Sequence, residues 1–292
     1  MSTPKLKLGI PKGSLQEATI KLFDKSGWKI KEHHRNYFPE IDDEEITCSM
    51  CRAQEMSRYV ETGLLDCGLT GKDWILENES DVEIVADLIY SKVSSRPARW
   101  VLAVAGDSPF KRPEDLQGRR ISTELTGYTR RYFQQAGIDV DVEFSWGATE
   151  AKVVEGLADA IVEVTETGTT IKAHGLRIIA EVLVTNTQFI ANKKAWADPW
   201  KRRKIENMIM MLQGALRAEK LVGLKMNVPS AAKDSVLAQL PSLNSPTVAH
   251  LLNSDWLSVE IVVAEAVVRD LIPKLKDAGA EGIIEYALNK VV

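Results

Sequence analysis

Short apolar segments alternate with amphipathic ones through the first third of the chain, and this alternation most constrains the fold. Residues 6–10, 46–50, 66–70 and 84–88 are apolar runs of strand length, and stretches with helical apolar spacing follow the first two. Strands separated by helices favour a mainly parallel sheet with helices on both faces. We therefore expect an α/β fold for this region.

A second block of the same kind begins near Trp100. Its expected strands are residues 120–123, 140–144, 160–164 and 176–179, with helices between them. The sequence Gly-Leu-Leu-Asp at 63–66 is echoed by Gly-Leu-Ala-Asp at 156–159, and each copy follows a helix and leads into a strand. This echo fits two similar α/β lobes with a cleft between them.

The tail of the chain has a different order of elements. Its six expected elements form a β-α-β-β-α-β series, the ferredoxin-like arrangement. They are strand 224–228, helix 230–239, strands 247–251 and 257–264, helix 267–278 and strand 282–286. The segment has few candidate acid–base residues, which indicates a sensor or assembly module.

Composition excludes several classes of function. The chain has 292 residues and a net charge of −4, which argues against a broad nucleic-acid footprint. No apolar run is long enough to span a bilayer, and the first residues lack the apolar core of a signal peptide. We expect a cytoplasmic protein that binds neither nucleic acid nor membrane.

The cysteines leave one alternative open. Only Cys48, Cys51 and Cys67 occur, so a disulfide framework is not expected. Cys48 and Cys51 have the spacing of half a zinc site, which His33 and His34 could complete. Adjacent histidines are poorly placed as a second ligand pair, so the favoured interpretation is that Cys48 is a small apolar residue in a strand.

The strongest chemical signal is the loop at residues 163–170. It follows an apolar strand, and its Gly168 allows the backbone to approach an anion closely. Amides at a helix start attract phosphate, and the threonine hydroxyls add donors. Glu163 and Glu166 could hold ribose hydroxyls or a metal ion that bridges phosphates. The sequence therefore predicts a site for a phosphorylated ribose, although a threonine-rich helix cap without a ligand is the alternative.

Other corners place basic or flexible residues after strands. Lys12 and Gly13 follow the first strand, Arg52 follows the second, and Gly71 follows the third. Ligands in open α/β sheets bind at the carboxyl ends of strands, so these corners are expected to line one face of the cleft. Glu150 at a helix start could point into the cleft or simply complement the helix dipole.

These segments together resemble the long form of the ATP phosphoribosyltransferase family, the first enzyme of histidine biosynthesis. The resemblance covers essentially the whole chain and rests on IPKGSL at 10–15, LDCGLTGKD at 65–73, DAIVEVTETGTT at 159–170, SPT at 245–247 and KDAGA at 276–280. Glu163 stands where many members of the family carry Asp.

The resemblance implies a fold and a reaction. The fold would be a two-lobed, periplasmic-binding-protein-like α/β catalytic region followed by a ferredoxin-like regulatory domain. The expected limits are 1–96 with 188–214 for one lobe, 97–187 for the other and 222–292 for the regulatory domain. N1 of the adenine of ATP would attack C1 of phosphoribosyl pyrophosphate (PRPP), and Mg²⁺ would neutralise the departing pyrophosphate.

The resemblance also implies three groups of contacts, with L-histidine as a feedback inhibitor and dimers assembling into hexamers. PRPP would contact Glu163, Glu166, Thr167, Gly168, Thr169 and Thr170. ATP and pyrophosphate would contact Lys12, Gly13, Arg52, Gly71, Asp73 and Glu150. Histidine would contact Asn227, Leu243, Ser245, Thr247, Val262 and Gly282. No catalytic residue and no metal ligand is assigned.

Two other functions remain open from the sequence. Two α/β lobes with a cleft also describe solute-binding and effector-sensing proteins, which would not need a loop of threonines flanked by carboxylates. A different phosphoribosyltransferase, with another base as its nucleophile, would share the same loop chemistry.

Overall fold

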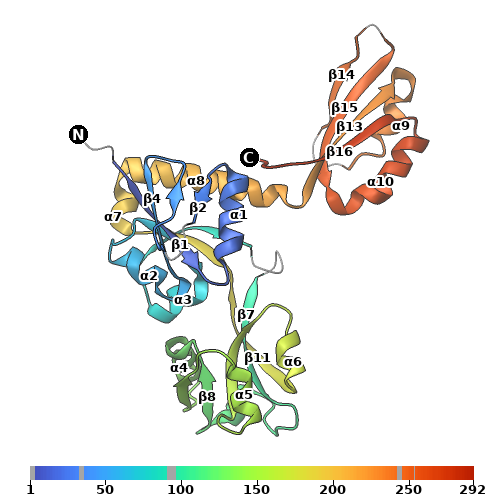
Figure 1. Cartoon of the computed structure of the whole chain (residues 1–292). Coiled ribbons are helices and arrows are strands. Elements are labelled where there is room, and N and C mark those ends of the chain that lie inside the picture. Colours follow the sequence, from blue (N-terminus) through green and yellow to red (C-terminus); the bar gives the residue numbers. More distant parts are fainter. Residues whose placement is uncertain (1–3, 33–35, 91–96, 242–244, 253) are drawn as a thin grey trace. The chain divides into compact units, whose positions relative to one another are not determined.

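The computed structural model describes residues 4–32, 36–90, 97–241, 245–252 and 254–292. The chain forms two compact units. The large unit comprises Met1–Asp24 and Trp28–Ile209, and the small unit comprises Lys25–Gly27 and Met210–Val292. The large unit contains two five-stranded sheets, which we call the first and second lobes (Figure 1).

The first lobe is built on a sheet of order β4-β1-β5-β12-β6. Its strands are β1 (Leu6–Lys12), β4 (Ile46–Arg52), β5 (Cys67–Gly71), β6 (Glu83–Leu88) and β12 (Thr187–Ala191). β1 runs parallel to β4 and β5, as the alternation of segments predicts. β12 comes from far along the chain and lies antiparallel between β5 and β6, so the sheet is mixed rather than wholly parallel.

Helices connect successive strands of the first sheet and also follow its last strand. They are α1 (Gln16–Ser26), α2 (Ala53–Glu61), α3 (Lys72–Asn78), α7 (Lys193–Ala197) and α8 (Pro199–Ala218), with a small ribbon of β2 (Ile30–Lys31) and β3 (Glu40–Ile41). α2 packs on β1, β4, β5 and β12. Its fully buried Met56 and Val60 share a core with Leu65 and Ile190.

The second lobe has the sheet order β11-β7-β10-β8-β9. Its elements are β7 (Ala98–Ala105), η1 (Pro113–Leu116), β8 (Arg120–Thr123), α4 (Thr126–Gln135), β9 (Asp141–Phe144), α5 (Thr149–Val154), β10 (Ala160–Thr165), α6 (Thr169–Ala173) and β11 (Leu176–Thr185). β8, β9 and β10 are parallel, so their carboxyl ends share one edge of the sheet. Buried side chains on both faces of this sheet, such as Trp100 and Ile161, form two cores.

The echo between residues 63–66 and 156–159 corresponds to the same local structure in both lobes. Asp66 accepts a hydrogen bond from the Lys7 amide at 2.9 Å, and its own amide donates to the Lys7 carbonyl. Asp159 makes the same pair of bonds with Arg120, also with 2.9 Å to the carboxylate. In each lobe an aspartate thus fixes the start of one strand against the beginning of its parallel neighbour.

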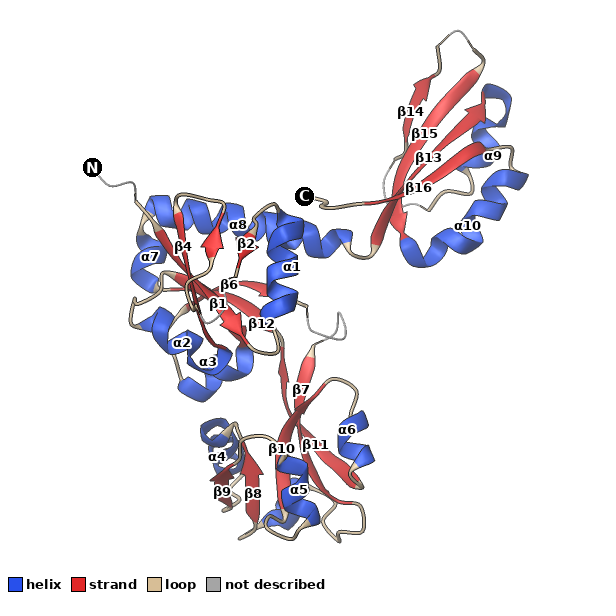
Figure 2. Ribbon diagram, in the orientation of Figure 1, coloured by secondary structure: helices blue, strands red, loops and turns tan. Residues whose placement is uncertain are grey.

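The small unit is a four-stranded antiparallel sheet of order β14-β15-β13-β16. Its elements are β13 (Leu221–Pro229), η2 (Ser230–Ala232), α9 (Lys233–Leu237), β14 (Thr247–His250), β15 (Trp256–Ala264), α10 (Glu265–Asp277) and β16 (Glu281–Ala287). α9 and α10 cover one face, where Leu224, Val259 and Leu271 are buried (Figure 2). This is the ferredoxin-like arrangement that the order of segments predicts.

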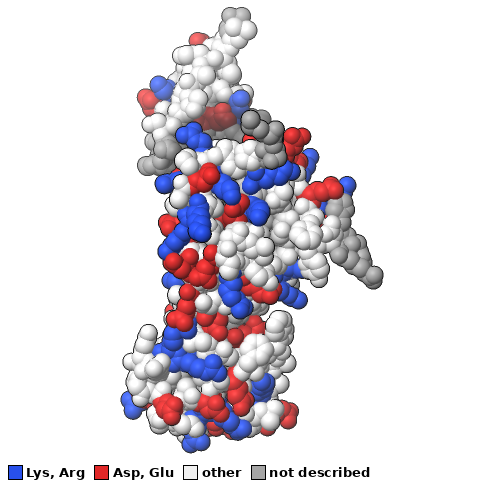
Figure 3. Space-filling model, turned by 90° about the vertical axis from the view of Figure 1, so that its left-hand side faces the viewer, with Lys and Arg blue, Asp and Glu red and all other residues white. Residues whose placement is uncertain are grey.

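The charge on the surface and the character of the helices agree with the net charge of −4 and with the lack of a long apolar run in the sequence. On the face shown in Figure 3, Lys and Arg side chains are interspersed with Asp and Glu. Among the described residues, no helix combines the length and the apolar character that crossing a bilayer requires.

Candidate functional site

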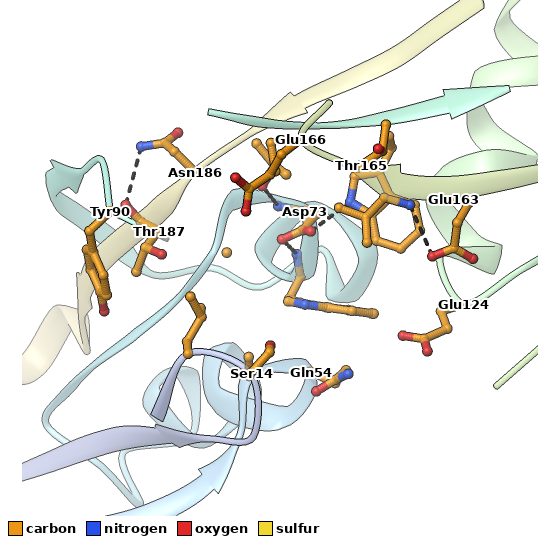
Figure 4. Close-up of a pocket in the computed structure, with 18 of the residues that line it drawn as sticks. Ser14, Gln54, Asp73, Tyr90, Glu124, Glu163, Thr165, Glu166, Asn186 and Thr187 are labelled. Carbon is orange, nitrogen blue, oxygen red and sulfur yellow. Dashed lines mark hydrogen bonds between the residues drawn. The ribbon is translucent and has the colours of Figure 1, made fainter. Parts of the chain in front are cut away.

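A cleft of about 520 Å³ is lined by both lobes of the large unit (Figure 4). The residues from the first lobe include Lys12, Ser14, Arg52, Gln54, Gly71, Asp73 and Tyr90. Those from the second lobe include Glu124, Glu163, Glu166, Thr167, Thr170 and Thr185. Most of the predicted substrate contacts therefore share one cavity. Gly13, Gly168 and Thr169 are adjacent in sequence to its lining but are not part of it, and Glu150 is neither part of the lining nor adjacent to it in sequence.

The first lobe contributes cations to this cleft through parallel strands. Lys12 ends β1 and Arg52 ends β4, and the two residues are paired in the register of these strands. The Lys12 ammonium lies 3.9 Å from the centre of the Tyr37 ring. Because parallel strands end at the same edge of a sheet, the two cations are neighbours, as we expected from their positions after strands.

The 163–170 loop connects β10 to α6. Gly168 has a φ of +77°, the left-handed conformation in which a side chain is strained. Its amide donates to the Thr165 hydroxyl at 2.8 Å, and the hydroxyls of Thr167 and Thr169 lie 2.8 Å apart. These local bonds hold the loop in a compact turn with its hydroxyl groups gathered at the start of α6.

Glu163 is a carboxyl group of the cleft with a strongly raised pKa. Its pKa is raised to about 7, chiefly by burial, and the negative charges of Glu150 and Glu124 contribute to this rise. A hydrogen bond from Thr149 and another from the Val164 amide act in the opposite direction. Glu163 therefore exchanges its proton near neutral pH, which is a property of functional carboxyl groups in clefts.

Glu124 is a cleft residue that the sequence analysis missed. It follows β8 directly, and burial raises its pKa. Hydrogen bonds from the Gln54 side chain and the Gly147 amide lower this pKa, and the charge of Asp73 raises it. Like Arg52, Glu124 directly follows a parallel strand, and ligands bind at the carboxyl ends of such strands. The same argument could therefore have predicted Glu124 from the sequence.

Asp73 lies in the cleft lining, but its carboxylate is already engaged. The Trp100 indole donates to one oxygen at 2.7 Å, and the Trp74 amide donates to the other at 3.0 Å. Burial raises the pKa of Asp73, and these hydrogen bonds lower it.

A row of hydroxyl and amide groups that the sequence did not reveal lies where β11 passes into β12. It comprises Thr185, Asn186 and Thr187, with buried Tyr90 beside them. The Tyr90 hydroxyl lies 2.8 Å from that of Thr19. No motif marks the three consecutive residues, and Tyr90 lies beside them because β12 pairs with β6.

The zinc alternative finds no support in the structure. Cys48 is 5% exposed within β4, which confirms its interpretation as a small apolar strand residue. Burial raises the pKa of both Cys48 and Cys51 to about 12, which disfavours the thiolates that zinc requires. His33 and His34 lie outside the described residues. Among the residues that are described, no group of three or more His, Cys, Asp or Glu side chains could hold a metal ion.

The residues expected to contact histidine are spread over the small unit. Asn227 in β13 and Gly282 in β16 are neighbours, since a Cβ atom on Gly282 would lie 3.6 Å from the Asn227 amide nitrogen. Thr247 lies on β14 at the opposite edge of the sheet, and Ser245 shortly precedes it. Val262 on β15 is 43% exposed. Leu243 lies outside the described residues.

Known proteins match the chain over nearly its full length. The family model of ATP phosphoribosyltransferase matches residues 52–214, and that of the HisG C-terminal domain matches residues 218–290. The ATP phosphoribosyltransferase of Solidesulfovibrio magneticus is 79% identical over 98% of both chains. That of Nitratidesulfovibrio vulgaris strain Hildenborough is 72% identical, also over 98% of both chains.

A solved structure supports the same assignment. It is an ATP phosphoribosyl transferase (HisG:HisZ) complex from Thermotoga maritima, with 31% identity and a TM-score of 0.61. The match covers 71% of this chain and 96% of that chain. These relatives exclude a non-enzymatic binding protein and a phosphoribosyltransferase of another family. The chain belongs to the ATP phosphoribosyltransferase family in its long form, and it is a pentosyltransferase of histidine biosynthesis.

Proposed function

We propose that the chain transfers the phosphoribosyl group of PRPP to N1 of the adenine of ATP and releases pyrophosphate. The observation that carries this proposal is the division of charge across one cleft. Carboxyl and hydroxyl groups of the second lobe face the Lys12 and Arg52 corner of the first lobe. PRPP has the matching division, with ribose hydroxyls and a 5-phosphate at one end and a pyrophosphate at the other.

The 163–170 loop would hold the phosphorylated ribose. Threonine hydroxyls and the amides that begin α6 donate to phosphate oxygens. In its ionised form Glu163 accepts hydrogen bonds from ribose hydroxyls, and in its protonated form it donates one. Lys12 and Arg52 would balance the charge of the departing pyrophosphate.

The reaction needs little covalent help from the protein. The lone pair of adenine N1 forms a bond to C1 as the bond from C1 to the pyrophosphate oxygen breaks. N1 carries no proton that must be removed before it attacks, so orientation and charge stabilisation supply most of the rate. Carboxylates near C1, such as Glu124 and Glu163, would stabilise the positive charge that develops there.

Mg²⁺ fits the chemistry of this cleft. Glu124, Glu163 and Glu166 offer carboxylate oxygens, the donors that Mg²⁺ prefers. Mg²⁺ commonly binds through one or two carboxylates together with substrate phosphates. When bound, it would neutralise the charge of the leaving pyrophosphate.

The small unit would sense L-histidine and reduce activity when it binds. Support comes from its separate core, from the position of Asn227 beside Gly282, and from its match to the family's C-terminal domain. We also propose that the chain works in the cytoplasm as a homo-oligomer, with dimers assembling into hexamers through the small unit.

A single assay tests the reaction. The purified full-length chain is incubated with Mg²⁺, ATP and PRPP, and N1-phosphoribosyl-ATP and pyrophosphate are measured. Both products are expected in equal amounts, and omission of PRPP serves as the control. If neither product forms, alone or with candidate partner proteins, the proposed reaction is wrong for this chain.

A further inference from the structure

The short helix α3 of the first lobe is in contact with the second lobe along its whole length. At its start, the Asp73 carboxylate accepts the 2.7 Å hydrogen bond from Trp100 of β7, and the Asp73 amide donates to the Thr185 hydroxyl of β11 at 3.2 Å. The next residue, Trp74, packs edge-on against Trp100, with ring centres 6.1 Å apart and planes at 90°. The beginning of α3 is thus fixed to two strands of the second sheet.

The end of α3 is joined to α4 of the second lobe by reciprocal capping. Glu77 accepts hydrogen bonds from the amides of Gly127 at 2.8 Å and Tyr128 at 2.7 Å, in the first turn of α4. Arg131 of α4 donates in return to the Leu76 carbonyl and lies 3.3 Å from the Glu79 carboxylate. A carboxylate at a helix start and a guanidinium at a helix end are both favourable in the helix dipole.

Gly71 explains how Asp73 reaches Trp100. Its φ is −73°, so the backbone does not require glycine there. A Cβ atom on Gly71 would lie 2.0 Å from an Asp73 carboxylate oxygen. The glycine therefore provides space for the Asp73 side chain.

We propose that Asp73 and Glu77 are positioning residues, which hold the second lobe on α3 and so set the separation between Lys12 and Arg52 and the 163–170 loop. Asp73 lines the cleft, yet both of its oxygens accept hydrogen bonds from tryptophan residues at the junction. Its effect on substrates therefore acts through the arrangement of the lobes. This inference rests on the proposed function for its kinetic consequences, whereas its structural consequence is independent of the reaction.

The structural test measures the distance between the lobes in the full chain. Nitroxide labels are attached to cysteines placed at exposed Lys21 and Gln135, in a background in which partly buried Cys51 is alanine. Pulsed electron resonance should give a narrow distance distribution for this protein. Trp100→Phe and Glu77→Gln should each broaden it, because each removes one hydrogen bond at one end of α3.

The matched control is Glu79→Gln. Glu79 follows α3 as its C-cap residue, two positions after Glu77, but its side chain is 69% exposed, so its ion pair with Arg131 is expected to contribute little. It should leave the distribution narrow. An unchanged distribution in both Trp100→Phe and Glu77→Gln, with folded protein, would overturn the proposal. Broadening by Glu79→Gln to the same extent would overturn it as well, because loss of surface charge would then be sufficient.

The kinetic test separates positioning from direct contact with ATP. Glu77→Gln, at a residue that does not line the cleft, should raise the KM for both ATP and PRPP several-fold. Asp73→Asn should behave like Trp100→Phe, and the double variant should be little worse than either. An effect of Asp73→Asn confined to the KM for ATP, absent from Trp100→Phe, would make Asp73 a ligand contact instead. A chain without transfer activity would refute the proposed function, and the distance measurement would still decide the role of α3.

Discussion

Glu163 is partly buried and lines the cleft. Its ionised form lowers the stability of the fold, while its carboxyl group serves the proposed function. Its pKa of about 7 in the folded protein lies above the usual value of 4.5. A carboxyl group whose pKa is raised on folding favours the folded protein while it is protonated in both the folded and the unfolded chain. This contribution is fully present below the unfolded pKa and is lost as pH rises through the folded pKa. The ionised group is therefore a source of instability above neutral pH.

Glu163→Gln should remove this instability. The gain in the free energy of unfolding of the large unit should be small near pH 5 and should approach about 2–3 kcal/mol near pH 8. Transfer activity should fall at the same time. Denaturant titrations at the two pH values measure the difference, with Glu155→Gln on the exposed surface of the same lobe as control. A gain that does not grow with pH would contradict the raised pKa.

Thr167 tests the contact to phosphate. Thr167→Ala removes a hydroxyl that lies 2.8 Å from that of Thr169, on the loop proposed to hold the ribose 5-phosphate. Loss of one hydrogen bond to a charged group corresponds to about 1.5–3 kcal/mol, so the KM for PRPP should rise by roughly tenfold or more. The KM for ATP should change less, and Thr167→Ser should restore most of the loss. Equal losses for the two substrates would indicate a folding role for the loop.

At the scale of elements, local patterns predicted most strands and helices, while long-range pairing remained hidden. The strands β1, β4 and β5 and the whole order of the small unit followed from apolar spacing. The insertion of β12 between β5 and β6 did not, because nothing in its five residues states which strands it will join. The loop at Gly168 could be predicted because its residues are consecutive in the sequence. The contacts of Asp73 could not, because its partners Trp100 and Thr185 lie in distant strands.

Gly71→Ala tests the junction between β5 and α3. The added methyl group cannot coexist with the present position of Asp73, so either the carboxylate or the backbone must move. Overpacking of this kind costs about 1–3 kcal/mol, and the bond between Asp73 and Trp100 should be lost. Denaturant titration should show that Gly71→Ala and Trp100→Phe are not additive. Full additivity would mean that the glycine acts independently of that bond.

At the scale of the whole molecule, the two units carry different tasks in the proposed function. Within the small unit, α9 and α10 pack on one face of the sheet, while Asn227 and Lys225 on β13 are both exposed. The resemblance to the family indicated which residues there would contact histidine, but the sequence alone contains no chemical motif that identifies the effector.

Asn227→Ala should weaken inhibition by histidine while leaving uninhibited turnover unchanged. The amide is a polar group beside Gly282 on the neighbouring strand, so its loss should raise the half-inhibitory concentration by about tenfold. Lys225→Ala, two residues earlier on the same strand, is the matched control and should retain the original sensitivity. Unaltered inhibition of the Asn227 variant would place the effector elsewhere.

The position of β12 also has a consequence for biosynthesis on the ribosome. β6 pairs with β12, and β12 lies between β6 and β5, although the entire second lobe separates β6 from β12 along the chain. The first sheet can therefore close only after Ala191 has emerged from the exit tunnel. Until then the nascent chain exposes unpaired edges of β5 and β6, and we expect the second lobe, which is continuous in sequence, to fold earlier. A polypeptide arrested before β12 should thus be a target for chaperones, with a native second lobe and an open first one.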